Sequence, residues 1–115
     1  MATSAEQVRE FALSLPESEE HAHFGRPSFR TRKRIFATLP DDEAAVLKLP
    51  LDEQAAVVES MPEVFSVGPW GHQGWTRADL TRADPEMIGE LLELAWSRIA
   101  TQRALKARDE TVGRA

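Results

Sequence analysis

The sequence predicts a single α+β domain in which helices cover one face of an antiparallel β-sheet. The chain has 115 residues, which is the size of one ordinary domain. Its content of hydrophobic residues, 42%, and of charged residues, 29%, is typical of a globular protein. Segments with the period of a strand and segments with the period of a helix follow one another in the order α-β-β-β-β-α-β-β-α.

The first helix is predicted to end before Pro16, which cannot continue it. Its start has two alternatives, because Thr3 and Glu6 have capping-box spacing and so do Ser4 and Gln7, one residue later. Apolar residues at helical spacing form one stripe, which consists of Val8, Phe11, Ala12 and Leu15.

Four strands follow this helix, separated by short polar breaks. The strands are predicted over residues 21–24, 28–31, 34–39 and 45–49. The breaks between them are at residues 25–27, 32–33 and 40–43. Because these connections are short, neighbouring strands are expected to pair in an antiparallel meander.

A second helix is predicted from the N-cap residue Asp52 to about Ser60, with Ala55, Ala56 and Val58 available for burial. Two further strands are predicted at residues 64–67 and 75–80. The loop between them, residues 68–74, is rich in glycine and proline.

The last helix starts with Asp84 as N-cap, Pro85 at its first position and Glu86 in its first turn. Its apolar stripe consists of Ile88, Leu91, Leu92, Ala95 and Ile99, with Trp96 at the edge. The domain is expected to span residues 1–104. The polar segment 105–115 is expected to be a frayed tail or an extension of this helix.

Composition excludes several classes of function. The chain has no cysteine, so disulfides, thiol nucleophiles and thiolate metal sites are excluded. No serine lies in a GxSxG motif, and the glycines form no GxGxxG motif, so we expect a binding protein without cofactors rather than an enzyme. The first 20 residues do not resemble a signal peptide, and no apolar stretch is long enough to cross a membrane, which predicts a cytoplasmic protein.

Positive charge is concentrated in one short segment. The formal net charge is −5, from 14 basic and 19 acidic side chains. Five cations without an acid among them fall within nine residues, and these are Arg26, Arg30, Arg32, Lys33 and Arg34. A hairpin that carries them could contact the phosphates of a nucleic acid. In the alternative interpretation, nearby acids such as Glu17, Glu19 and Glu20 neutralise a solvated hairpin.

The loop at residues 68–74 and the strand after it contain a second candidate site, formed by Trp70, His72 and Trp75. These side chains could form a stacking surface for a base, a small ligand or a protein. Trp75 fits a core position better than an exposed one.

A metal site has weaker support. His21 and His23 share one side of a strand with Glu19, but three adjacent strand positions converge poorly on an ion. We expect no metal there.

Five segments resemble the MmcQ/YjbR family of small α+β proteins. They are Phe24-Gly25-Arg26-Pro27-Ser28-Phe29, Ile35-Phe36-Ala37, Val46-Leu47-Lys48-Leu49, the stretch from Asp52 through Pro62-Glu63-Val64-Phe65, and Gly74-Trp75 with the last-helix segment Leu92 to Trp96. The resemblance covers about residues 4–103. It implies a CyaY-like fold, core positions for Phe24 and Phe29, and DNA binding through a double-wing arrangement.

The segment Thr76-Arg77-Ala78-Asp79 departs from the family, which usually has an apolar strand there. This strand is therefore expected to be short or at an edge of the sheet. The function expected first is a non-enzymatic module that binds DNA weakly and without sequence specificity through the basic hairpin. The alternative is a domain that binds a protein or a small ligand through the sheet face and the Trp70–Trp75 loop.

Overall fold

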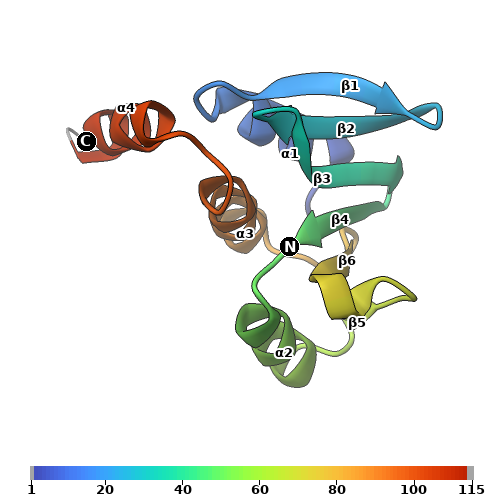
Figure 1. Cartoon of the computed structure of the whole chain (residues 1–115). Coiled ribbons are helices and arrows are strands. Elements are labelled where there is room, and N and C mark those ends of the chain that lie inside the picture. The colour runs from blue at the N-terminus through green and yellow to red at the C-terminus, as the bar shows by residue number, and fades with distance from the viewer. Residues whose placement is uncertain (1, 114–115) are drawn as a thin grey trace.

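One antiparallel sheet of six strands organises the chain, of which the computed structural model describes residues 2–113. The strands lie side by side in the order β1-β2-β3-β4-β6-β5 (Figure 1). Their bounds are β1 (Glu19–His23), β2 (Arg26–Thr31), β3 (Arg34–Asp41), β4 (Ala44–Lys48), β5 (Phe65–Val67) and β6 (Trp75–Asp79). The predicted meander and the predicted element order are confirmed.

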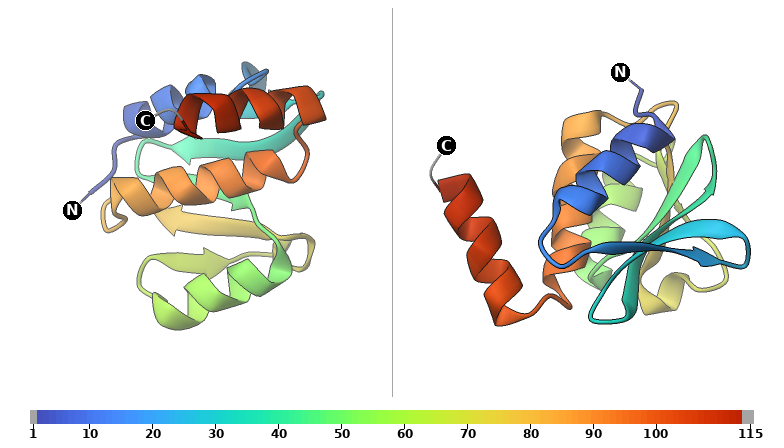
Figure 2. Two further views of the ribbon diagram at one scale, coloured as in Figure 1. Left: turned by 90° about the vertical axis from the view of Figure 1, so that its left-hand side faces the viewer. Right: turned by 90° about the horizontal axis from the view of Figure 1, so that it is seen from above.

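Three helices cover one face of this sheet (Figure 2). They are α1 (Ala5–Ser14), α2 (Leu51–Ser60) and α3 (Pro85–Ser97). α3 packs on β3 and β4 and lies beside α1, whereas α2 contacts β5. In the described part of the chain no helix covers the opposite face, which we call the open face.

The core lies between the sheet and the three helices. The strands contribute Phe29, Phe36 and Leu47, each with 0% of its surface exposed. Trp96, expected at the edge of the α3 stripe, is also buried, and its indole nitrogen donates a hydrogen bond to the carbonyl of Pro16 at 3.0 Å. This bond satisfies the polar end of a large side chain that otherwise contributes apolar surface to the core.

Ser4, rather than Thr3, caps α1. The Ser4 hydroxyl accepts from the backbone of Gln7, and the Gln7 side chain accepts from the backbone of Ser4, which completes the second of the two predicted capping boxes. Thr3 is buried and donates instead to the carbonyl of Ala83 at 2.8 Å. This bond attaches the start of the chain to the segment that precedes α3.

The predictions for α2 were wrong at its start and on its buried face. The N-cap is Pro50, and Asp52 lies in the first turn. Gln54 and Val57 are buried, Val58 is half-buried, and both Ala55 and Ala56 are exposed. The four apolar residues Ala55, Ala56, Val57 and Val58 are consecutive, so their spacing does not reveal which of them faces the sheet.

β6 is an internal strand of five residues, which corrects the expectation of a strand at the edge of the sheet. It pairs with β4 on one side and with β5 on the other. Its polar residue Thr76 is fully buried, where its hydroxyl donates to the carbonyl of Gly74 at 3.0 Å and accepts from the side chain of Gln54 at 3.1 Å. Hydrogen bonding therefore allows a polar residue in the middle of the sheet.

The prediction for the polar segment after α3 is also corrected. The chain turns after α3 and forms a separate helix, α4 (Gln102–Gly113). Ala104 of α4 is 1% exposed, and Arg108 donates to the carboxylate of Glu93 in α3 at 2.8 Å. These contacts order the helix against the domain; residues 114 and 115 lie outside the described residues. No helix in residues 2–113 is long and apolar enough to cross a membrane.

Candidate nucleic-acid interface

The turn between β2 and β3 presents cations in a backbone conformation that L-residues rarely adopt. Arg32 and Lys33 have φ angles of 54° and 65°, and Thr31 pairs with Arg34 on either side of them. A two-residue turn with positive φ at both positions fits the twist of a hairpin and is normally Asn-Gly or a similar pair. The Arg-Lys pair imposes conformational strain, which is a feature often found at functional sites.

Four of the five predicted cations gather at this turn. Arg30 is the penultimate residue of β2, Arg34 begins β3, and Arg32 and Lys33 form the turn between the strands. Arg26 lies at the opposite end of β2, and a strand rises about 3.3 Å per residue, so Arg26 is roughly 20 Å from the turn. The five cations therefore do not form one patch.

The acids proposed to neutralise these cations pair with other groups. Glu20 lies 2.7 Å from Arg9, and Glu17 lies 3.4 Å from Arg103. Glu19 lies 3.8 Å from His21. Within residues 2–113, none of the ion pairs involves the five predicted cations. None of these three acids therefore forms an ion pair with the hairpin cations, although Glu19 is the cross-strand partner of Arg30 in the pairing of β1 with β2.

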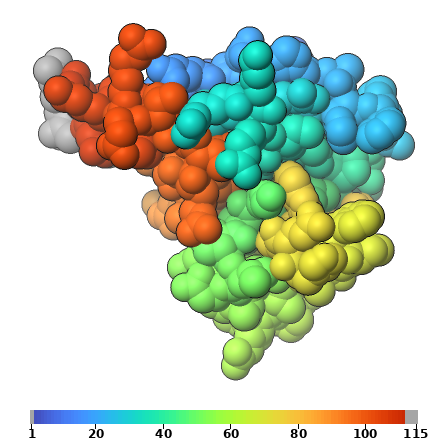
Figure 3. Space-filling view, viewed as in Figure 1, coloured from blue at the N-terminus to red at the C-terminus, as the bar shows by residue number. Residues whose placement is uncertain are grey.

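Two further cations join the turn at a cavity of about 400 Å³. Its walls include Arg34, Lys48 and Arg98, and no carboxylate is among the described residues that line it. The β2–β3 turn, the end of β4, the start of α2 and the end of α3 all lie at this end of the molecule (Figure 2). In the space-filling view, the cyan residues of the turn lie beside the orange residues near the end of α3 (Figure 3).

We call this region the basic end; it comprises Arg30, Arg32, Lys33, Arg34, Lys48 and Arg98. Sequence reasoning missed the last two members. Lys48 is 14 residues from Arg34, and Arg98 is the C-cap of α3. Only the packing of α3 across β3 and β4 brings them together, so no local pattern could have indicated it.

A separate hollow of about 440 Å³ lies on the open face. Trp70 and Trp75 line it, together with Ile35 and Val46. Trp70 is 62% exposed, and the predicted core position of Trp75 is wrong because its side chain is half-buried on this face. The alternation of β6 explains the difference: Thr76 takes the inward position, so its neighbour Trp75 points outward.

His72 does not join the two tryptophans in this hollow. It lines the cavity of the basic end, although its ring centroid is only 6.3 Å from that of Trp70. The structure thus divides the second predicted site between two neighbouring depressions.

The loop that carries these side chains is held by buried hydrogen bonds. The side-chain amide of Gln54, in α2, donates to the carbonyl of Gly71 at 3.0 Å and lies within 3.3 Å of the carbonyl of Trp75. Gly74 has a φ of 97°, and its carbonyl accepts from the backbone N–H of Leu49 at 2.9 Å. The loop is therefore fixed to both α2 and the end of β4.

The histidines of β1 are His21, which lies 3.8 Å from Glu19, and His23. Residues 2–113 contain no group of three or more side chains of the metal-binding type in a suitable arrangement. The ring of His23 packs edge-on against Phe24, at 4.6 Å between centroids. Phe24 is 92% exposed at the tip of the β1–β2 turn, so its expected core position is wrong, whereas Phe29 is buried as expected.

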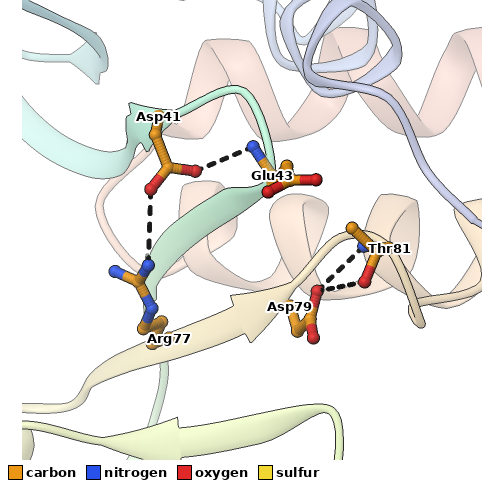
Figure 4. Close-up of polar contacts among 5 residues, drawn as sticks. All are labelled: Asp41, Glu43, Arg77, Asp79 and Thr81. Atoms are coloured by element: carbon orange, nitrogen blue, oxygen red, sulfur yellow. Dashed lines mark hydrogen bonds and ion pairs between the residues drawn. The ribbon is translucent and has the colours of Figure 1, made fainter.

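The end of the sheet opposite the basic end is acidic. Asp41, Glu43, Glu63 and Asp79 line a depression there, and Arg77 lies 3.5 Å from Asp41 (Figure 4). Hydrogen bonds from the hydroxyl of Thr81 and then from its backbone N–H hold the pKa of Asp79 below its ordinary value. β3 therefore runs from the cations of the β2–β3 turn to a cluster of carboxylates.

A family model decides the relationship that the sequence motifs indicated. The YjbR model matches residues 13–98, which is well over half of the chain. The chain belongs to the YjbR family. The YjbR match contains the whole sheet and every member of the basic end, and α4 lies beyond it.

Structural comparison agrees with the YjbR assignment at the level of the fold. The crystal structure of the Deinococcus radiodurans protein DR2400, which has a DUF419 domain, is similar with a TM-score of 0.75 and 21% sequence identity. The similarity covers 98% of this chain and 89% of that chain. No curated protein matches the sequence.

Proposed function

We propose that this YjbR-family protein is a non-enzymatic module that binds nucleic acid by contacting phosphates with its basic end. The observation that carries the proposal is the gathering of six cations at one end of the sheet, where Arg34, Lys48 and Arg98 line a cavity whose described lining contains no carboxylate. Arginine and lysine contacts to phosphates position a protein on a nucleic acid and do not read its sequence. Binding is therefore weak and independent of sequence.

The charge of the rest of the molecule supports a single orientation on the nucleic acid. The net charge is −5, so the acidic surfaces repel phosphate while the basic end attracts it. The strained Arg32-Lys33 turn favours the same conclusion, since a less strained pair such as Asn-Gly would suffice for the hairpin alone.

A second candidate function uses the open face. The hollow beside Trp70 and Trp75 could hold a small apolar ligand or a side chain of a protein partner. The 62% exposure of Trp70 favours this candidate, because a large apolar side chain so exposed is a common feature of binding surfaces.

The salt dependence of DNA binding tests the first proposal. Fluorescence anisotropy of a labelled mixed-sequence duplex, measured from about 50 mM to 200 mM salt, gives the slope of log affinity against log salt. Each phosphate neutralised contributes about −0.9 to that slope, so the triple variant Arg32→Ala, Lys33→Ala, Arg34→Ala should flatten it by about 3. Arg98→Ala should flatten it by about 1, because Arg98 lines the same cavity as Arg34.

The matched control is the triple variant Arg9→Ala, Arg77→Ala, Arg82→Ala. It removes the same amount of charge, but each of these arginines already pairs with a carboxylate and none of them belongs to the basic end. The slope should change little in this variant. Absence of binding to both duplex and single-stranded DNA at about 50 mM salt, where such contacts are strongest, would exclude the proposal.

A further inference from the structure

We infer that the cavity of the basic end and the hollow on the open face form one site for an unpaired nucleotide. Its phosphate would lie among Arg34, Lys48 and Arg98, and its base would lie against Trp70 and Trp75. The phosphate half rests on the proposed function, and the base half adds a preference for single-stranded over duplex nucleic acid.

The two depressions adjoin each other. Ile35 and Gln73 line both of them, so the cations of one depression and the indoles of the other lie on either side of the same two residues. Lys48 connects them as well, because it lines the cavity while its ammonium nitrogen lies 5.4 Å from the centre of the Trp75 ring. A ligand with an anionic part and a flat aromatic part matches a basic cavity that lies next to an aromatic hollow.

The hollow has the chemistry of a stacking site. Its lining contains no lysine, arginine or carboxylate among the described residues, and Ile35 and Val46 give it an apolar floor. Indole rings stack with all four bases, which suits binding without sequence preference. Trp70 is the exposed member, and the loop that carries it is fixed by the hydrogen bonds of Gln54 and Gly74.

Base pairing is incompatible with this arrangement. In a duplex the faces of the bases are covered by stacking on one another, and a base reaches a protein ring only after it leaves the stack. A single strand has no such cost, so its bases are free to reach the indoles while its phosphates contact the basic end.

Three labelled probes of equal length separate the two halves of the site. They are a twelve-nucleotide oligothymidine strand, the same strand with abasic residues throughout, and a twelve-base-pair duplex. At about 50 mM salt, anisotropy should show about tenfold tighter binding of oligothymidine than of the abasic strand, since stacking of one base is worth about that factor. Oligothymidine should also bind more tightly than the duplex.

The variant Trp70→Ala should lower the affinity for oligothymidine several-fold and leave the affinity for the abasic strand and the salt slope unchanged. Phe24→Ala is the matched control, because Phe24 is also an exposed aromatic residue but lines neither depression. It should leave all three affinities unchanged.

Equal affinities for oligothymidine and the abasic strand would overturn the base half while the phosphate proposal stands. So would tighter binding of the duplex, or an unchanged affinity for oligothymidine in Trp70→Ala. Absence of binding to all three probes would overturn the proposed function as well.

Discussion

Gly74 shows how one residue fixes the site. Its φ of 97° lies in the left-handed region that favours glycine, and a Cβ atom there would overlap the backbone carbonyl oxygen of Leu49. Gly25 also has a positive φ, 77°, but a Cβ atom there would meet nothing within 4 Å. Both glycines therefore have a positive φ that favours glycine, but only Gly74 also lacks the space for a side chain.

We predict that Gly74→Ala destabilises the protein by about 1–3 kcal/mol more than Gly25→Ala does. Both substitutions strain the backbone, and only Gly74→Ala also separates the loop from the end of β4. Urea denaturation of the two variants measures the difference. Equal free energies of unfolding for the two variants would show that the close contact with Leu49 does not contribute to the stability of the protein.

Gln54 is a residue whose role follows from its surroundings. Its side-chain amide donates hydrogen bonds to the carbonyl of Gly71 and to the hydroxyl of Thr76. Without Gln54, both buried acceptors would lose this donor. A buried polar group without a partner costs about 1–3 kcal/mol, so Gln54 stabilises the loop that carries both candidate surfaces.

At the scale of elements, α3 is the helix that the sequence predicted best. Ile88, Leu91, Leu92 and Ala95 are all buried, as their spacing indicates. The expected stripe is too long at its end, because α3 stops at Ser97 and Ile99 is only half-buried beyond it. Of the buried residues of the sheet, Phe36 and Leu47 lie in strands that α3 contacts, whereas Phe65 lies in β5, which α2 contacts.

We predict that Leu92→Ala lowers the free energy of unfolding by about 2–5 kcal/mol, because the side chain is fully buried and its removal leaves a cavity. Leu13→Ala is the matched control in α1, where the leucine is 40% exposed, and it should cost less than about 0.5 kcal/mol. Thermal or chemical unfolding gives both values. A neutral Leu92→Ala would contradict the packing of α3 on the sheet.

At the scale of the whole molecule, charge is separated along the strands. The cations of the basic end are free of ion pairs within residues 2–113, and carboxylates gather at the opposite end. Like charges held together by the fold repel one another, so a bound polyanion should stabilise the folded state.

We predict that heparin raises the melting temperature at low salt, since a ligand at 100 times its Kd adds about 2.7 kcal/mol to the stability of the state that binds it. The shift should disappear in the triple variant Arg32→Ala, Lys33→Ala, Arg34→Ala and persist in the triple variant of Arg9, Arg77 and Arg82. Differential scanning fluorimetry measures both. Equal shifts in the two variants would contradict an assignment of polyanion binding to the basic end.

The sequence by itself determined the order of the elements from α1 to α3, the capped start of α3 and the tip of the basic hairpin, and it limited the start of α1 to two capping boxes. These features depend on local spacing, such as the capping box of Ser4 and Gln7 or the stripe that includes Leu92, and local spacing is visible in a sequence.

Only the tertiary structure decided which residues share a surface. Lys48 and Arg98 reach the cavity because β4 and α3 end beside the β2–β3 turn, and Arg26 leaves the group because β2 separates it from that turn. Trp75 faces outward because its neighbour Thr76 is satisfied inside by Gln54. Each outcome depends on contacts between segments far apart in the chain, which periodicity within one segment cannot specify.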